Sequence, residues 1–292
     1  MNEYHVVSSL GETLSFLKKY EGKARIIAGG TDLILQLEEG KHKVDALVDI
    51  SELTEYKQIK EEKGFLKLGA LCTHAQIAAS PLVQKIAPAL AEASKSVGSP
   101  QIRNIGTLGG NIVNAQPAAD ASIALTALDA RVAVVSQTGQ KEIPIGQLFS
   151  GVGKSTLDPS CEILLEVLIP VKKGNATSSF SRLSKRKSLS LPVLNNAVSV
   201  VLNSDFSIFQ EVRIAVGPVA AVPWRAEDAE SYLQGAVVSS NAVKEASLLA
   251  ARKAAPRESL RGSTGYRKEM VSVLVYRSIE AAVKRLGRDL NG

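Results

Sequence analysis

Two short stretches of the sequence place a pair of glycines directly before side chains that form hydrogen bonds. The first is IIAGGTDL, from Ile26 to Leu33, and the second is TLGGN, from Thr107 to Asn111. Glycine adopts positive φ freely, so a glycine pair lets the backbone turn successive N–H groups toward one point. Such a group of donors forms a concave anion site. Two of these sites in one chain predict a clamp on the two phosphates of a pyrophosphate.

The elements around the first motif must hold its N–H groups in place. The apolar run Arg25 to Ala28 predicts a buried strand, and Thr31 to Glu39 predicts a helix. The N–H groups from Gly29 to Asp32 would then lie at a helix N-terminus, where the dipole favours anions. In the second motif we expect the N–H groups of Gly109 and Gly110 to meet the same ligand.

The rest of the chain alternates strand and helix patterns, which predicts an α+β fold. Before residue 175 we expect a helix at 9–20, a helix with Thr73 as its N-cap that restarts at Pro81 and continues over 83–97, and a helix at 121–128. We expect strands at 44–50, 58–62, 65–68, 131–136, 141–145 and 162–169. Beyond it we expect strands at 198–202 and 212–219 and helices at 240–254 and 266–286. The polar run from Lys172 to Ser179 predicts a boundary between two parts of the chain.

The motifs resemble those of a known family. AGGTDL and QIRNIGTLGGN look like the two FAD-binding motifs of the flavoprotein subunits of molybdenum hydroxylases, which include xanthine, carbon monoxide and nicotinate dehydrogenases. FSGVGKSTLDPSCEILLEVLIP, VRIAVGPVAAVPWRAEDAE and GSTGYRKEMVSVLVYRSIEAA are similar to later segments of that family. The resemblance implies a two-lobed FAD-binding domain of the PCMH/CO dehydrogenase flavoprotein type at 1–175, with lobes of approximately 1–55 and 56–175. A smaller α+β domain, like the CO dehydrogenase flavoprotein C-terminal domain, would occupy 176–292.

The resemblance also implies a function. FAD would lie non-covalently between the lobes, receive electrons from an iron–sulfur subunit and pass them to NAD or another acceptor. A separate molybdenum-cofactor subunit would select the organic substrate. Hydride transfer needs no acid or base from the protein, so no catalytic residue is named, and the protein's part is to place and tune the flavin.

The residues that the resemblance assigns to the cofactor come from both motifs and from three later positions. They are Ile26, Ile27, Ala28, Gly29, Gly30, Thr31, Asp32, Leu33, Thr107, Leu108, Gly109, Gly110, Asn111, Asp120, Leu164 and Lys185.

Each of the three later positions also has a simpler interpretation. Asp120 would accept from flavin sugar hydroxyls, or it is only a helix N-cap. Leu164 would pack on the isoalloxazine ring, or it is only a strand core residue. Lys185 would lie near the flavin ring, or the run Ser184 to Ser188 is only a solvated charge cluster. Val97 stands where a related enzyme has an aromatic residue near the adenine.

Other functional classes fit the sequence poorly. GVGKST, from Gly151 to Thr156, imitates the end of a phosphate-binding P-loop, but Leu148 stands where that motif needs its first glycine, and Pro159 opposes the required helix. The three histidines are scattered without metal-ligand spacing, and nothing marks a catalytic triad. We therefore expect no metal site.

Composition narrows the class further. The net charge of +6 comes from dispersed residues with few aromatics, so nucleic-acid binding is not expected. The two cysteines, Cys72 and Cys161, cannot by themselves ligate an iron–sulfur cluster, and they suit a reducing cytoplasm. No signal peptide and no apolar run of roughly 20 residues is evident, so we expect a cytoplasmic protein without a membrane span.

Two alternatives remain open. One is a stand-alone FAD-dependent reductase of the same superfamily, which would need a proton donor and a different glycine motif. The other is a scaffold subunit without flavin, against which the intact glycine pairs argue.

Overall fold

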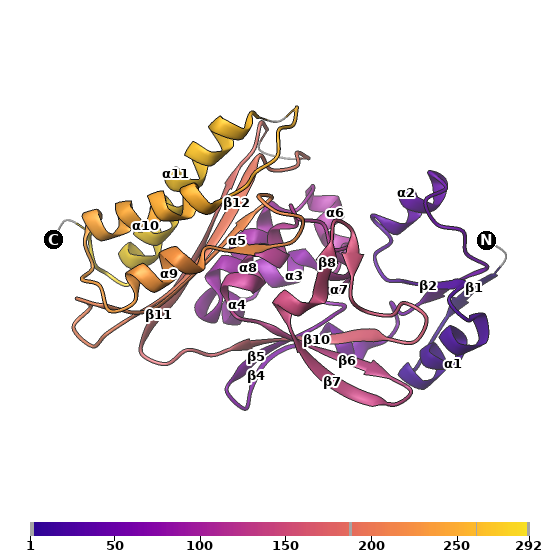
Figure 1. The fold of residues 1–292 in the computed structure, drawn as a ribbon. Coiled ribbons are helices and arrows are strands. Elements are labelled where there is room, and N and C mark those ends of the chain that lie inside the picture. Colours follow the sequence, from indigo (N-terminus) through magenta and orange to yellow (C-terminus); the bar gives the residue numbers. More distant parts are fainter. Residues whose placement is uncertain (1–2, 187–188, 261, 291–292) are drawn as a thin grey trace.

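Three units follow one another along the chain in the computed structural model, which describes residues 3–186, 189–260 and 262–290. We call them the N-terminal unit (residues 3–53), the central unit (54–171) and the C-terminal unit (175–290). Figure 1 shows the N-terminal unit in indigo at one end of the molecule and the helices of the C-terminal unit in orange and yellow at the other. The mixed helix and sheet content confirms the expected α+β class.

A three-stranded parallel sheet forms the N-terminal unit, in the order β1-β3-β2. Its elements are β1 (Glu3–Val6), α1 (Leu10–Tyr20), β2 (Ala24–Ile27), α2 (Leu33–Glu38) and β3 (Ala46–Asp49). The side chain of Ser9 caps α1 by accepting from the N–H of Glu12 at 3.2 Å. The sequence therefore located α1 and β2 correctly, whereas β1 was missed and α2 begins two residues later than expected.

A five-stranded antiparallel sheet forms the base of the central unit, in the order β4-β5-β10-β6-β7. Its strands are β4 (Ile59–Glu62), β5 (Phe65–Gly69), β6 (Arg131–Ser136), β7 (Gly139–Pro144) and β10 (Ile163–Pro170), and a short hairpin joins β8 (Phe149–Gly151) to β9 (Lys154–Ser155). The expected hairpins at β4–β5 and β6–β7 are both confirmed.

Six short helices cover this sheet. They are α3 (His74–Ala79), α4 (Pro81–Ile86), α5 (Pro88–Ser96), α6 (Pro100–Ile105), α7 (Leu108–Val113) and α8 (Asp120–Ala127). Thr73 and Gln76 form a capping box at the start of α3, which confirms Thr73 as its N-cap. The helix expected at 83–97 is broken at Ala87, because Pro88 lacks an N–H and starts a new helix.

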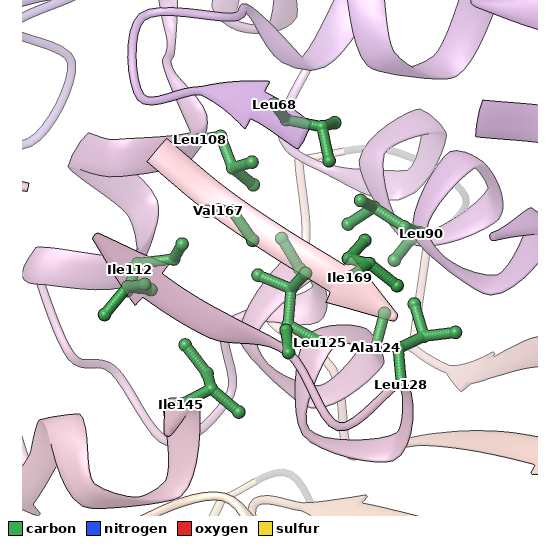
Figure 2. Close-up of a cluster of buried hydrophobic side chains, with 14 of the residues drawn as sticks. Leu68, Leu90, Leu108, Ile112, Ala124, Leu125, Leu128, Ile145, Val167 and Ile169 are labelled. Carbon is green, nitrogen blue, oxygen red and sulfur yellow. The ribbon is translucent and has the colours of Figure 1, made fainter. Parts of the chain in front are cut away.

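The largest hydrophobic core lies between the sheet and these helices (Figure 2). Leu68 of β5 and Val167 and Ile169 of β10 lie opposite Leu108 and Ile112 of α7 and the apolar side chains of α8. The second glycine motif thus contributes α7, which is anchored in the core of the central unit.

A four-stranded antiparallel sheet, β11-β12-β13-β14, forms the C-terminal unit together with three helices. The elements are β11 (Asn175–Leu183), β12 (Leu194–Leu202), β13 (Phe209–Gly217), β14 (Trp224–Arg225), α9 (Glu227–Leu233), α10 (Ser240–Lys253) and α11 (Thr264–Arg285). Helices α10 and α11 match the sequence expectation. Helices α5 and α8 of the central unit pack against β11 and β12, which joins the two units.

Strand β11 begins at Asn175, inside the polar run from Lys172 to Ser179 that was expected to mark a boundary. Two of its serines, Ser178 and Ser179, are buried, and their hydroxyls bond backbone groups of neighbouring helices. Ser178 accepts from the N–H of Ala89 at 3.1 Å, and Ser179 donates to the carbonyl of Ser278 at 2.6 Å. These long-range contacts override the weak strand preference of the polar sequence.

No helix in the described part of the chain is long and apolar enough to cross a membrane.

Candidate cofactor-binding cleft

A cleft of about 690 Å³ lies where the N-terminal unit meets the central unit. Its walls come from the loop between β2 and α2, from α6 and α7, and from the hairpin β8–β9. The volume is typical of small-molecule sites. Both glycine motifs therefore open on one cavity, as the sequence predicted.

The first glycine motif presents backbone donors to this cleft. Gly29, Gly30, Thr31 and Asp32 all line it, and their N–H groups donate no hydrogen bond to any other residue that the structure describes. Gly30 has a φ of +68°, a conformation that glycine adopts without strain. Gly29, Gly30 and Thr31 are half-buried and Asp32 is exposed. N–H groups that are shielded from water need an acceptor, and several in succession favour an anion.

Gly29 is required by a close approach between the two units. A Cβ at this position would lie 2.0 Å from the carbonyl oxygen of Ile105, directly before the second glycine motif. Only glycine therefore allows the first loop to rest against the backbone at Ile105 and Gly106. This contact brings the two motifs together.

The second motif uses its N–H groups differently from what the sequence predicted. The N–H of Gly109 donates to the carbonyl of Ala70 at 2.8 Å, and that of Gly110 donates to the hydroxyl of Thr107 at 3.1 Å. Thr107 is thus the N-cap of α7. Both N–H groups are already paired, contrary to the expectation that they are available to a pyrophosphate. Gly109 is a packing residue, because a Cβ there would lie 2.8 Å from the Cβ of Ala70.

The predicted residues therefore fall into two groups. Those that line the cleft are Ile26, Ile27, Ala28, Gly29, Gly30, Thr31, Asp32, Leu33, Thr107, Gly110 and Asn111. Leu108, Gly109, Asp120, Leu164 and Lys185 do not line it. Leu108 points into the core of the central unit (Figure 2). In Asn111, the side-chain oxygen Oδ1 is buried without a hydrogen-bond partner among the described residues, so its acceptor capacity is unused there.

Asp120 joins the central and C-terminal units. Its carboxylate accepts from Asn195 Nδ2 at 2.6 Å and from Ser96 Oγ at 2.9 Å, and it lies 3.4 Å from Arg182 Nε. The N-cap interpretation is wrong, because Ala119 is the N-cap of α8 and no side chain caps that helix. Burial raises the pKa of Asp120, and Arg182, Asn195 and Ser96 oppose that rise. A contact with flavin hydroxyls stays a prediction.

Leu164 and Lys185 likewise stay predictions as flavin contacts. Leu164 is a buried residue of β10 that belongs to the core of the central unit. Lys185 is exposed after β11, and its Nζ donates to the carbonyl of Leu260 at 3.0 Å. The last two residues of the SKRKS run, Lys187 and Ser188, lie outside the described residues.

Comparison with known proteins decides the family. Residues 1–172 match the family described as the FAD binding domain in molybdopterin dehydrogenase, and residues 178–282 match the CO dehydrogenase flavoprotein C-terminal domain. The chain belongs to the FAD-binding subunits of the molybdenum hydroxylases. FAD is the cofactor of this family, which confirms the sequence expectation.

Relatives in this flavoprotein family cover the chain almost from end to end. The chain is 30% identical to the carbon monoxide dehydrogenase medium chain of Hydrogenophaga pseudoflava, over 97% of each chain. It is 34% identical to the nicotinate dehydrogenase FAD-subunit of Eubacterium barkeri, over 80% of each.

Solved structures agree with these sequence relatives. A carbon monoxide dehydrogenase structure from Hydrogenophaga pseudoflava matches with a TM-score of 0.91 at 29% identity, covering 97% of this chain and 98% of that one. Quinoline 2-oxidoreductase from Pseudomonas putida 86 matches with a TM-score of 0.91 at 26% identity, covering 99% of each chain.

The cleft of this flavoprotein subunit fits FAD. In the loop from Gly29 to Asp32 the N–H groups donate to no described residue, and the Asn111 oxygen has no partner among the described residues. Val97, which stands where a related enzyme has an aromatic residue, lines the same cleft. The residues present therefore supply both kinds of partner that a dinucleotide requires.

Several cleft residues escaped the sequence analysis. The GVGKST segment forms the β8–β9 hairpin, and Gly153, Lys154 and Ser155 line the cleft. A two-residue strand follows where a P-loop needs a helix, which confirms that the motif is not a P-loop. The N–H of Gly153 donates to the carbonyl of Ala115 at 3.0 Å, so the hairpin tip is fixed beside α7. The similarity of this segment to the corresponding segment of the family could have indicated that these residues line the cleft.

Gln36 and Asn114 close one side of the cleft. Gln36 Nε2 donates to Asn114 Oδ1 at 3.2 Å, which links α2 of the N-terminal unit to the end of α7. His42 Nε2 lies 3.2 Å from Gln36 Oε1 and holds the amide in place. No sequence pattern indicated this contact, because the two side chains are 78 positions apart.

Proposed function

We propose that this FAD-binding subunit carries electrons from an iron–sulfur partner subunit to NAD or another acceptor. The observation that carries the proposal is the cluster of unpaired N–H groups from Gly29 to Asp32 in a cleft between two units. Bound FAD supplies the redox chemistry, since it takes up electrons singly or in pairs. The chain's own residues bind the diphosphate, orient the dinucleotide and shape the cleft around it.

The proposal includes two partners, a molybdenum-cofactor subunit that selects the substrate and an iron–sulfur subunit. The names of the relatives support it, because they describe an FAD-subunit and a medium chain of larger dehydrogenases. Among the described residues no group of three or more metal-ligating side chains could hold a metal ion. A cytoplasmic location belongs to the same proposal and suits the two free cysteines, Cys72 and Cys161.

The proposal is tested on the chain expressed with and without its neighbouring genes. We expect the isolated chain to show flavin absorbance bands and the co-expressed chain to purify with two further subunits. Substrate of the complex should bleach the flavin bands, and NAD or a dye acceptor should restore them. A chain that binds no FAD would favour a scaffold, and reduction of the isolated chain by NAD(P)H with turnover of an organic substrate would favour a stand-alone reductase.

A further inference from the structure

His74 is a buried side chain of the cleft to which neither the family motifs nor the fold gives a role. It is 2% exposed and lines the cleft at the start of α3. Its Nδ1 is a buried atom with no hydrogen-bond partner in the described part of the chain. A buried polar atom without a partner costs about 1–3 kcal/mol, so a ligand that gave Nδ1 a partner would remove this cost.

The imidazole lies where both glycine motifs meet. The N–H of His74 donates to the carbonyl of Gly106 at 3.1 Å, directly before Thr107. A Cβ built on Gly106 would lie 3.6 Å from His74 Cδ2 and 3.7 Å from the Thr31 hydroxyl oxygen. Glycine at this position therefore keeps a small space open between the imidazole and the first glycine loop.

The charge state of the ring suits a donor. Burial, together with the positive charge of Arg103, lowers the pKa of His74 to about 4, so the ring is neutral at physiological pH. A neutral imidazole carries one N–H donor and one acceptor nitrogen. Phosphate oxygens only accept, so the tautomer that carries its proton on Nδ1 would give this unpartnered atom an acceptor.

We propose that His74 donates a hydrogen bond to the FAD diphosphate, beside the unpaired N–H groups of the first glycine loop. This inference rests on the proposed FAD site and adds one side chain to it. It assigns the diphosphate, and not the isoalloxazine, as the part of the cofactor that contacts the ring. The contact would give the buried Nδ1 the partner that it lacks among the described residues.

The test is made on the full chain after removal of flavin, with FAD, ADP and riboflavin as ligands. Replacing His74 by leucine removes the donor and keeps an apolar side chain of similar size. A hydrogen bond to a charged acceptor is worth about 1.5–3 kcal/mol, so FAD and ADP should bind about one to two decades more weakly. Riboflavin has no phosphate, and its affinity should change by less than about twofold.

Conservative variants and a stability readout separate binding from folding. Asn and Gln at position 74 each reproduce one of the two ring nitrogens as an N–H donor, and at least one of them should recover most of the FAD affinity. Thermal melting of the flavin-free His74→Leu chain should stay equal or rise, because an unpartnered nitrogen has been removed. If the leucine variant fails to fold, the Asn and Gln variants are compared with the same three ligands. The control is His5→Leu, which removes a histidine of β1 that lies outside the cleft and is bonded to Tyr20, so its FAD affinity should equal that of the wild type.

Three outcomes would overturn the inference. They are unchanged FAD affinity in His74→Leu, an equal loss for riboflavin and FAD, and no recovery in either conservative variant. Failure of the wild-type chain to bind FAD and ADP would instead reject the proposed FAD site itself.

Discussion

Gly29 offers a sharp test of how the two glycine motifs are joined. A methyl group at this position would lie 2.0 Å from the oxygen and 2.7 Å from the carbon of the Ile105 carbonyl. Real Cβ atoms essentially never lie closer than 3.0 Å to another heavy atom, so the loop and the Ile105 backbone must separate by roughly 1 Å or more. Neither partner is a flexible side chain, and the strain falls on the backbone that carries the unpaired N–H groups.

From this geometry we expect two effects of Gly29→Ala. Overpacking should lower the free energy of unfolding by about 1–3 kcal/mol. Displacement of the loop should cost at least one charge-assisted hydrogen bond to the diphosphate, which corresponds to about one to two decades in the dissociation constant of FAD. Urea unfolding of the flavin-free chain and fluorescence titration with FAD measure the two effects separately.

Gly11→Ala is the matched control. Gly11 lies in α1 with no heavy atom within 4 Å of an added Cβ. Alanine is favoured over glycine in a helix by about 0.5–1 kcal/mol, so this variant should be slightly more stable and bind FAD as the wild type does. Gly29→Ala with wild-type FAD affinity would refute the reasoning, because the loop would then tolerate the displacement that the contact with Ile105 demands.

The remaining predictions concern three other positions. In Gly110→Val the new side chain lies at the cleft, with its Cβ 3.0 Å from the Thr107 hydroxyl oxygen, so the chain should stay folded and lose flavin. Normal flavin absorbance would reject a cofactor role for Gly110. Asp120→Ala should cost about 3–5 kcal/mol in urea unfolding because Arg182 loses its buried partner; a loss below about 1 kcal/mol would contradict the interpretation of Asp120 as a junction residue. The pKa of His74 is about 4 in the folded chain and 6.5 as its ordinary value, so the unfolded chain binds the proton first as pH falls. Stability should therefore drop by about 2–3 kcal/mol from pH 7 to pH 4.5, and His74→Leu should abolish that part of the pH dependence; an identical slope in both proteins would show that another group titrates.

Much of the fold was predictable where the deciding interactions are local. The cap of α1 by Ser9, the capping box of Thr73 and the hairpin turns all depend on residues within four positions of one another. The strand, glycine turn and helix of the first motif also follow one another as expected, and its residues line the cleft. Caps and turns of this kind can be predicted from a single sequence, because the residues that form them are close together in the chain.

The second glycine motif shows why the rest could not be predicted. Whether the N–H of Gly109 faces a ligand or a neighbour depends on Ala70, whose carbonyl accepts from it across the fold. Strand β11 and the hairpin at Lys154 were missed for the same reason, since partners distant in the sequence determine both. The interpretation of Asp120 as an N-cap failed because the helix begins one residue earlier than the side chain would require.

The central claim is that the N–H groups from Gly29 to Asp32 hold the FAD diphosphate. Residue-resolved amide hydrogen exchange by NMR, with and without saturating FAD, tests it most directly. Without flavin these amides donate to no described residue, so they should exchange rapidly. With FAD bound we expect strong protection of these four amides, and saturating riboflavin should leave them unprotected. Equally fast exchange of Gly29–Asp32 in the flavin-free and FAD-saturated chains would contradict the account.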